Sequence, residues 1–210
     1  MKIKDGVCGL VVADALGVPV EFQSREKLKE NPIVGMVGYG SYNQPPGTFS
    51  DDSSLTLATI NSLVRQKSPL NIIDYDNIMK EFVKWRYKGK YTPYGEAFDI
   101  GNTTKIAIEN YKNGSKALSS GGKNEKDNGN GSLMRILPIA FYLNSREYSY
   151  EVVDNLSALT HAHERSKLAC NYYIQIAISI LNNDLSLKGH IETASNKIQN
   201  HYKDSKELIH

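Results

Sequence analysis

The chain has 210 residues, of which 40% are hydrophobic and 23% are charged, and its 25 Lys and Arg nearly balance its 23 Asp and Glu. This length and apolar content favour one domain, residues 1–210, with a sizeable core. The formal charge of +2 excludes a nucleic-acid binder that works through bulk positive charge. No apolar run reaches the roughly 20 residues of a membrane helix, so we expect no membrane association.

The first predicted element is a helix over residues 5–16, whose side chains are apolar or small almost throughout. Gly17 and Pro19 form a typical stop signal after it. A helix that is apolar on nearly every side is usually buried on nearly every side, so we expect it in the middle of the domain. Because Asp5 and Asp14 interrupt the stretch, a signal peptide is not expected.

Residues 29–49 are rich in Gly and Pro and predict a long loop, of the kind that is usually functional. A second long loop, 113–132, is rich in Gly, Asn, Ser and Lys. The apolar run 133–143 contains Pro138, where a helix would be kinked or would restart. Apolar side chains at helical spacing predict further helices, over about 50–65, 74–87, 103–112, 149–159, 164–182 and 186–201. The predicted class is therefore all-α.

Two cysteines, Cys8 and Cys170, lie far apart in apolar patterns. Such cysteines are typical of reduced core residues, which predicts a cytoplasmic protein.

Ser50, Asp51 and Asp52 begin the helix predicted at 50–65, beside Thr48 and Ser53. A single hydroxyl or carboxylate would suffice to cap the helix, and capping is the commoner use of such residues. A cluster of hard oxygen donors is also what Mg²⁺ prefers. From these residues alone, capping is favoured about two to one over a metal site.

Two further carboxylates flank the end of the first helix. Asp14 lies inside a helix that is expected to be buried, so it must be paired, hydrogen-bonded or protonated. We favour an interpretation in which it accepts hydrogen bonds from backbone N–H groups of a neighbouring loop, over one in which it lies behind a metal site. Glu21 could reach into a cleft, although a lone glutamate is more often a solvated surface residue.

Residues 128–135 form a glycine-rich turn that leads into a predicted helix. The backbone N–H groups of such a turn can hold a phosphate, with Ser132 as a helix cap and Arg135 balancing negative charge. The turn is a weak signal, because it completes neither a dinucleotide-binding nor a phosphate-loop motif.

His161 and His163 are two positions apart, which on a helix places them about 200° apart. No further Cys or His set completes a zinc site. One interpretation is that one histidine is a cap or a core residue and the other is exposed; we expect one functional histidine at most.

Five motifs in order resemble the ADP-ribosylglycohydrolase family, the type that includes the dinitrogenase-reductase-activating glycohydrolases. They are Gly9-Leu10-Val11-Val12-Ala13-Asp14-Ala15-Leu16-Gly17-Val18-Pro19-Val20-Glu21-Phe22, Ser50-Asp51-Asp52-Ser53, Gly101-Asn102-Thr103-Thr104, Gly129-Asn130-Gly131-Ser132-Leu133-Met134-Arg135 and Thr160-His161-Ala162-His163. The resemblance implies an all-α orthogonal multi-helix bundle with long polar loops around a central cleft and two Mg²⁺ ions.

The resemblance also implies a hydrolase that removes ADP-ribose from a modified protein side chain or a small acceptor. Ser50, Asp51 and Asp52 would bind metal, and Glu21, Asp51 and Asp52 would be catalytic. Asn130, Gly131, Ser132 and His161 would bind the substrate.

One departure from the family pattern concerns the metal. Family members carry a further Asp-x-Asp-Thr type motif near the C-terminus, and the only carboxylates after residue 184 are Glu192, Asp204 and Glu207. We therefore expect Mg²⁺ to be bound as one ion or weakly, unless a homo-oligomer or a completing chain supplies ligands. The alternatives to a hydrolase are an inactive relative that binds ADP-ribose and a helical interaction protein in which the aspartates are caps.

Overall fold

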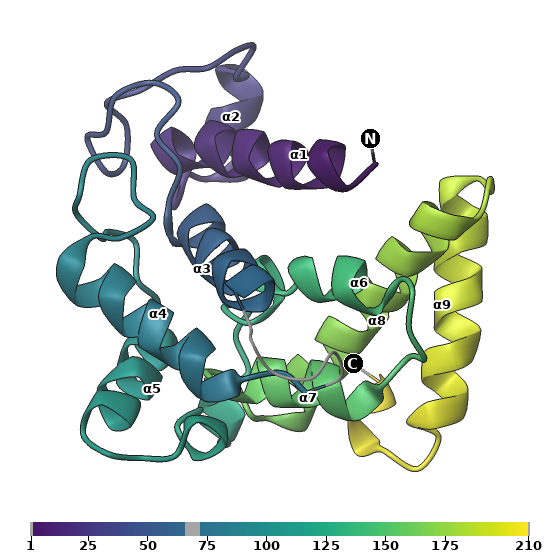
Figure 1. Ribbon diagram of the computed structural model, residues 1–210. Coiled ribbons are helices and arrows are strands. Elements are labelled where there is room, and N and C mark those ends of the chain that lie inside the picture. The colour runs from purple at the N-terminus through teal and green to yellow at the C-terminus, as the bar shows by residue number, and fades with distance from the viewer. Residues whose placement is uncertain (1, 66–71, 210) are drawn as a thin grey trace.

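The computed structural model describes residues 2–65 and 72–209, which fold into α-helices and short 3₁₀ turns (Figure 1). The α-helices are α1 (Lys2–Gly17), α2 (Arg25–Glu30), α3 (Asp51–Arg65), α4 (Tyr75–Lys88), α5 (Asn102–Lys112), α6 (Pro138–Leu143), α7 (Tyr150–Ala158), α8 (Glu164–Asn182) and α9 (Leu187–His201). The 3₁₀ turns are η1 (Val18–Val20), η2 (Ala117–Ser119), η3 (Glu125–Asp127), η4 (Leu133–Arg135) and η5 (Lys206–Ile209). The predicted all-α class is confirmed.

Most helix boundaries follow the sequence signals. α1 ends at Gly17, and α6 begins at Pro138, which takes the first helical position, where its missing N–H costs nothing. The apolar run 133–143 is thus split into η4 and α6 rather than kinked. α2 was not predicted; Ser24 caps it by accepting a hydrogen bond from the N–H of Lys27.

Two helices organise the core. α3 packs against α1, α4 and α6, and α8 packs against α6, α7 and α9. The core between these helices contains fully buried side chains that recur at helical spacing, among them Leu55, Phe82, Trp85, Leu156 and Ile174. This packing holds the N-terminal ends of α3 and α5 beside the end of α1.

The expectation that the first helix is buried in the middle of the domain is wrong for these residues. Ala15 is the buried residue of α1, and the side chain of Val12 is 50% exposed. Figure 1 shows α1 lying along one edge of the molecule. The expectation for Cys8 on the same helix is also wrong, since Cys8 is exposed, whereas Cys170 is buried as predicted. α1 therefore presents apolar surface that the described chain leaves uncovered.

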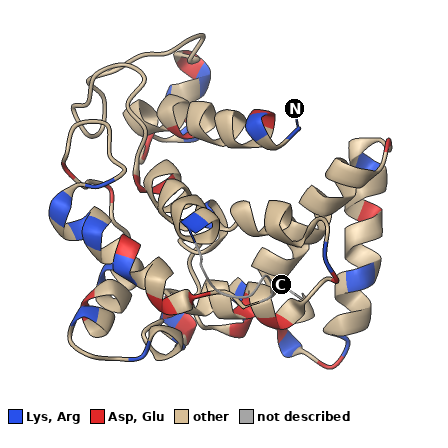
Figure 2. Cartoon of the chain, viewed as in Figure 1, with Lys and Arg blue, Asp and Glu red and all other residues tan. Residues whose placement is uncertain are grey.

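Charge is unevenly distributed over the helices. Figure 2 shows Lys and Arg gathered on α4. Across the described ranges, no helix is both long enough and apolar enough to span a bilayer.

Candidate functional site

A cavity of about 1320 Å³ lies where the end of α1 meets the N-terminal ends of α3 and α5. Carboxylates line it from four segments of the chain: Asp14, Glu21, Asp51, Asp52 and Asp99. The described residues that line this cavity include no Lys or Arg. We call it the acidic cavity, and its unbalanced negative charge is its main electrostatic property.

Asp14 joins α1 to the start of α3. Its carboxylate accepts hydrogen bonds from the Ser50 N–H at 3.0 Å, the Ser50 hydroxyl at 2.8 Å and the Ser53 N–H at 2.9 Å. These N–H groups at a helix N-terminus have no partner within the helix, so a carboxylate from another helix caps it. The interpretation of Asp14 as an acceptor for backbone N–H groups is confirmed.

Asp51 and Asp52 lie on the first turn of α3, which Asp14 already caps. Asp51 is buried, and its pKa is raised well above the ordinary value by burial and by the neighbouring carboxylates, Asp52 first among them. Burial, together with Asp14 and Asp99, raises the pKa of Asp52 to about 6. Capping therefore does not account for this pair, which is held in a place that disfavours its negative charge.

Glu21 and Asp99 form a second carboxyl pair in the cavity. Burial and the adjacent Asp99 raise the pKa of Glu21 to about 7. The Tyr42 hydroxyl donates a hydrogen bond to Asp99, and burial and this carboxylate raise the pKa of Tyr42. Glu21 can therefore hold a proton near neutral pH, beside the Asp99 carboxyl group.

The backbone around this pair is strained. Phe22 and Asp99 both adopt left-handed conformations, with φ of 62° and 59°, which non-glycine residues rarely occupy. The Phe22 side chain is 86% exposed, and its ring contacts the edge of Tyr42, which in turn packs on Phe98. Such strain tends to occur at functional sites.

The glycine-rich loop 129–131 and His161 form another part of the cavity wall. A Cβ on Gly131 would lie 2.7 Å from the His161 ring and 2.8 Å from the Thr104 hydroxyl, so only glycine fits. Asn130 is exposed beside it and also lines the cavity. The loop backbone is thus in direct contact with His161.

His161 is buried and neutral. Burial, and then the nearby Arg135, lower its pKa to about 4. Arg135 donates a hydrogen bond to the Thr160 hydroxyl at 2.7 Å, and that hydroxyl lies 2.9 Å from His161 Nδ1. In the tautomer in which Nδ1 accepts the hydrogen bond from the Thr160 hydroxyl, the imidazole proton is on Nε2. Nε2 lies near Gly129 and Gly131, so His161 offers an N–H donor to the cavity.

Ser132 is the predicted site residue that the structure does not place at this cavity. Its side chain is fully buried, where its hydroxyl accepts a hydrogen bond from Ser157 and contacts Cys170. Arg135 is also fully buried, and its guanidinium lies over the Phe82 ring. The suggested role of Arg135 in balancing phosphate charge is therefore wrong, because the guanidinium is buried in the core and does not line the cavity.

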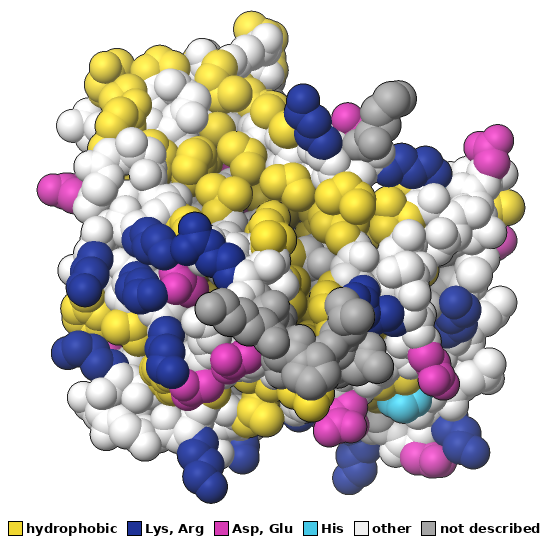
Figure 3. Space-filling model, in the orientation of Figure 1, with side chains coloured by type: hydrophobic (Ala, Val, Ile, Leu, Met, Phe, Trp, Pro, Cys, Tyr) yellow, Lys and Arg dark blue, Asp and Glu magenta, His cyan; other side chains and the backbone are white. Residues whose placement is uncertain are grey.

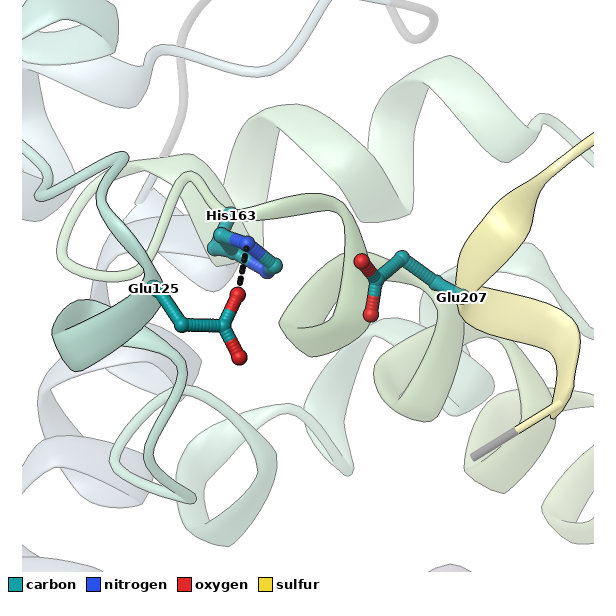
Figure 4. A group of neighbouring side chains, drawn as sticks. All are labelled: Glu125, His163 and Glu207. Atoms are coloured by element: carbon teal, nitrogen blue, oxygen red, sulfur yellow. Dashed lines mark ion pairs between the residues drawn. The ribbon is translucent and has the colours of Figure 1, made fainter.

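His163 is a helix cap. Its Nδ1 accepts a hydrogen bond from the Arg165 N–H at the start of α8, and its Nε2 lies 3.3 Å from a Glu125 oxygen (Figure 4). With Glu207 these residues form a group that could hold a metal ion. Arg165, however, pairs with Glu125 at 3.1 Å and with Glu207 at 2.6 Å. While the cap is in place His163 has no free lone pair, so the group acts as an ion-pair network.

Asp99 and Tyr42 are the site residues that sequence reasoning missed. Asp99 comes two residues before Gly101, the first residue of the motif Gly101-Asn102-Thr103-Thr104. Its closeness to that motif is the sequence signal that could have identified it. Tyr42 lies in the Gly- and Pro-rich loop 29–49, which carries no periodic pattern.

Comparison with known proteins places this geometry in context. A family model described as ADP-ribosylglycohydrolase matches residues 1–209. The chain is 31% identical over 173 residues to the ADP-ribosylarginine hydrolase Tri1 of Serratia proteamaculans, a match that covers 81% of this chain and 45% of the relative. It is 33% identical over 165 residues to the ADP-ribosyl-[dinitrogen reductase] glycohydrolase of Rhodospirillum rubrum, covering 77% of this chain and 52% of the relative.

A solved structure titled ADP-ribosylglycohydrolase-related protein complex has the same fold. It superposes with a TM-score of 0.69 at 20% identity and covers 95% of this chain and 60% of that one. The chain spans about half the length of the curated relatives that it matches.

Proposed function

The chain belongs to the ADP-ribosylglycohydrolase family, and on that premise we propose that it acts as one domain that hydrolyses the bond between ADP-ribose and a modified protein side chain. The observation that carries the proposal is the acidic cavity, where five carboxylates face a glycine loop and a neutral histidine N–H donor. A relative is named an ADP-ribosylarginine hydrolase, which makes arginine the first acceptor to test.

The carboxylate set suits a divalent cation. Asp51 and Asp52 carry charge that burial disfavours, and the described lining of the cavity provides no Lys or Arg to balance it. The Ser50 hydroxyl donates its proton to Asp14 and accepts a hydrogen bond of 3.5 Å from the Asp52 N–H, which leaves it one lone pair for a cation. We propose that Ser50, Asp51 and Asp52 hold Mg²⁺, which would orient the vicinal ribose hydroxyls and stabilise negative charge.

The part of the wall formed by loop 129–131 and His161 suits the diphosphate. Backbone N–H groups of a glycine turn bind phosphate oxygens, and loop 129–131 lines the cavity. In this proposal Asn130 and Gly131 contact the diphosphate, and His161 donates from Nε2 to a phosphate or ribose oxygen. Because His161 is neutral at pH 7, it supplies a hydrogen bond rather than a charge.

The Glu21–Asp99 pair can move the protons of the reaction. Hydrolysis forms a bond from a water oxygen to the anomeric carbon and breaks the bond from that carbon to the leaving nitrogen, through an oxocarbenium-like state. One carboxylate takes a proton from water, and the carboxyl of the pair gives one to the leaving guanidine. One proton is taken up and one is released, so the number of protons on the site is unchanged. A Glu21 pKa of about 7 lets that residue gain or lose a proton near neutral pH.

The charge of the cavity supports a cationic acceptor. An arginine guanidinium is attracted by the carboxylates and can stack on an aromatic ring such as Tyr42. A serine acceptor gains neither interaction.

The test is release of free ADP-ribose from a peptide that is ADP-ribosylated on arginine, with Mg²⁺ and with EDTA. We expect Mg²⁺-dependent release that Asp51→Asn and Asp52→Asn abolish and that Asp204→Asn, a change of an exposed aspartate, leaves unaltered. ADP-ribose binding without release would assign the chain as a binding relative. If a folded sample showed no binding and no release of ADP-ribose, both functions would be rejected.

A further inference from the structure

Arg135 is a buried cation without a carboxylate partner. The Lys and Arg side chains visible in Figure 3 lie at the surface, where water can hydrate them, whereas Arg135 is fully buried. Among the described residues it forms no ion pair, and its Nε and Nη1 atoms have no hydrogen-bond partner. The Phe82 ring, 4.9 Å from the guanidinium carbon, compensates only in part. Packing alone therefore does not explain an arginine at this position.

The third guanidinium nitrogen, Nη2, makes both hydrogen bonds of Arg135. It donates to the Leu156 carbonyl at 3.1 Å and to the Thr160 hydroxyl at 2.7 Å. Leu156 lies four residues before Thr160, and a carbonyl at that distance is a common acceptor for a threonine hydroxyl near a helix. Arg135 bonds this carbonyl instead. Because arginine can only donate, the Thr160 oxygen is an acceptor in its bond to Nη2, and the hydroxyl proton is left for another partner.

Thr160 joins Arg135 to His161. The Thr160 side chain is fully buried, and its hydroxyl oxygen lies 2.9 Å from His161 Nδ1. A buried hydroxyl proton needs an acceptor, and Nδ1 is the one that the described residues place within hydrogen-bond distance. If Nδ1 carried the imidazole proton, the Thr160 oxygen would face two donors and its own proton would have no acceptor. The arrangement favours a bare Nδ1 and a proton on Nε2.

The Nε2 atom of His161 faces the glycine loop of the acidic cavity. A Cβ added to Gly131 would lie 3.2 Å from Nε2, and both residues line the cavity. Arg135 and Thr160 do not line it. Any effect of these two residues on a ligand in the cavity must therefore pass through His161.

The charges around His161 keep its imidazole neutral. Burial lowers its pKa most, followed by Arg135, whereas Asp127 acts in the opposite direction. A neutral imidazole can carry its proton on either nitrogen, so the tautomer decides what the ring offers to a ligand. With the proton on Nε2, the ring presents a hydrogen-bond donor to the cavity.

We propose that Arg135 is a positioning residue that acts through Thr160 to keep the imidazole proton of His161 on Nε2, facing the acidic cavity. Arg135 occupies the Leu156 carbonyl and one lone pair of the Thr160 oxygen, which turns the hydroxyl proton toward Nδ1. His161 is thereby fixed as a hydrogen-bond donor to an oxygen of the ligand. The tautomer is a property of the fold, whereas its use on ADP-ribose rests on the proposed function.

The direct test is to locate the imidazole proton of His161 by long-range ¹H–¹⁵N spectra of the histidine-labelled chain, at neutral pH in EDTA. The signals that disappear in His161→Gln are those of His161. We expect a protonated Nε2 and a bare Nδ1 in the parent chain. Arg135→Met should move both nitrogen shifts toward intermediate values, because the Thr160 hydroxyl can then turn to Leu156 and accept a proton from Nδ1. Arg146→Met, a change of an exposed arginine, should leave both shifts unaltered.

The affinity for ADP-ribose, measured by calorimetry, is the second readout. Arg135→Met and Thr160→Val should each weaken binding about tenfold, whereas Thr160→Ser, which keeps the hydroxyl, should bind as the parent chain does.

A proton on Nδ1 in the parent chain would overturn the proposal, and this result needs no variant to fold. His161 shifts that Arg135→Met leaves unaltered would overturn it as well. The expected shifts in a chain that binds no ADP-ribose would support the positioning role of Arg135 and reject the proposed function.

Discussion

The carboxylate of Asp14 accepts hydrogen bonds from both the backbone N–H and the hydroxyl of Ser50, 36 residues further along the chain. These bonds tie the last turns of α1 to the first turn of α3. They also satisfy helix N–H groups that Asp51 and Asp52 would otherwise cap, which leaves that pair facing the acidic cavity. Asp14 is thus a positioning residue for the candidate site.

Asp14→Ala should lower the free energy of unfolding by about 1–3 kcal/mol, because the start of α3 loses a charged acceptor for several hydrogen bonds. Chemical denaturation measures the change. Asp204→Ala, at an exposed position, serves as the control and should stay within about 0.5 kcal/mol of the parent chain. Equal effects of the two substitutions would show that Asp14 does not hold α3.

Asp52→Asn should have the opposite effect in EDTA. Burial and neighbouring carboxylates disfavour the Asp52 charge, so its removal should raise the melting temperature of the ion-free protein. The same substitution should remove the rise in melting temperature that Mg²⁺ produces in the parent chain. A Mg²⁺-induced rise of equal size in both proteins would exclude Asp52 as a metal ligand.

Glu21→Gln should change how stability depends on pH. The raised pKa of about 7 means that, between about pH 4.5 and 7, folded Glu21 binds more protons than it does in the unfolded chain. Its contribution to stability is therefore fully present below about pH 4.5 and is lost as the pH rises through 7. His161 works in the opposite direction from pH 4 to about 6.5, because its pKa is lowered to about 4.

The measurement is therefore the difference in free energy of unfolding between Glu21→Gln and the parent chain, in EDTA, from pH 4.5 to 8. We expect the substitution to become more stabilising as the pH rises, with His161 cancelling from the difference. A difference that is constant over this range would contradict the raised pKa.

Gly131→Ala and Gly129→Ala form a matched pair in the glycine loop. A Cβ at position 131 would collide with His161 and Thr104, whereas one at position 129 would make an ordinary contact 3.8 Å from His161. We expect Gly131→Ala to weaken ADP-ribose binding by at least tenfold, about 1.4 kcal/mol, and Gly129→Ala to change it little. Calorimetric titration of both variants tests this, and equal affinities would show that the loop and His161 do not act together.

Much of the fold could be predicted from the sequence, because the signals that set helix ends and buried helix faces are local. Gly17 and Pro19 end α1, Pro138 restarts a helix as α6, and the spacing of Ile78, Phe82 and Trp85 predicts the buried face of α4. Such signals depend only on backbone geometry and on one face of a helix. Helix ends and buried faces can therefore be predicted without knowledge of tertiary packing.

The rest depended on contacts between distant segments. The apolar residues of α1 indicate burial, yet the packing of the described residues leaves Val12 half exposed. The orientation of Ser132 is decided by Ser157 and Cys170, far along the chain. Asp99 lies in a loop with a left-handed backbone, where no periodic pattern marks it.

The most direct test of the account is a calorimetric titration of the folded 210-residue chain with ADP-ribose, in Mg²⁺ and then in EDTA. The account predicts saturable binding of one ADP-ribose per chain that is strongest with Mg²⁺ and is weakened at least tenfold by Asp51→Asn. Binding that is unaffected by EDTA and by Asp51→Asn, or no binding at all, would contradict the assignment of the acidic cavity as an ADP-ribose site.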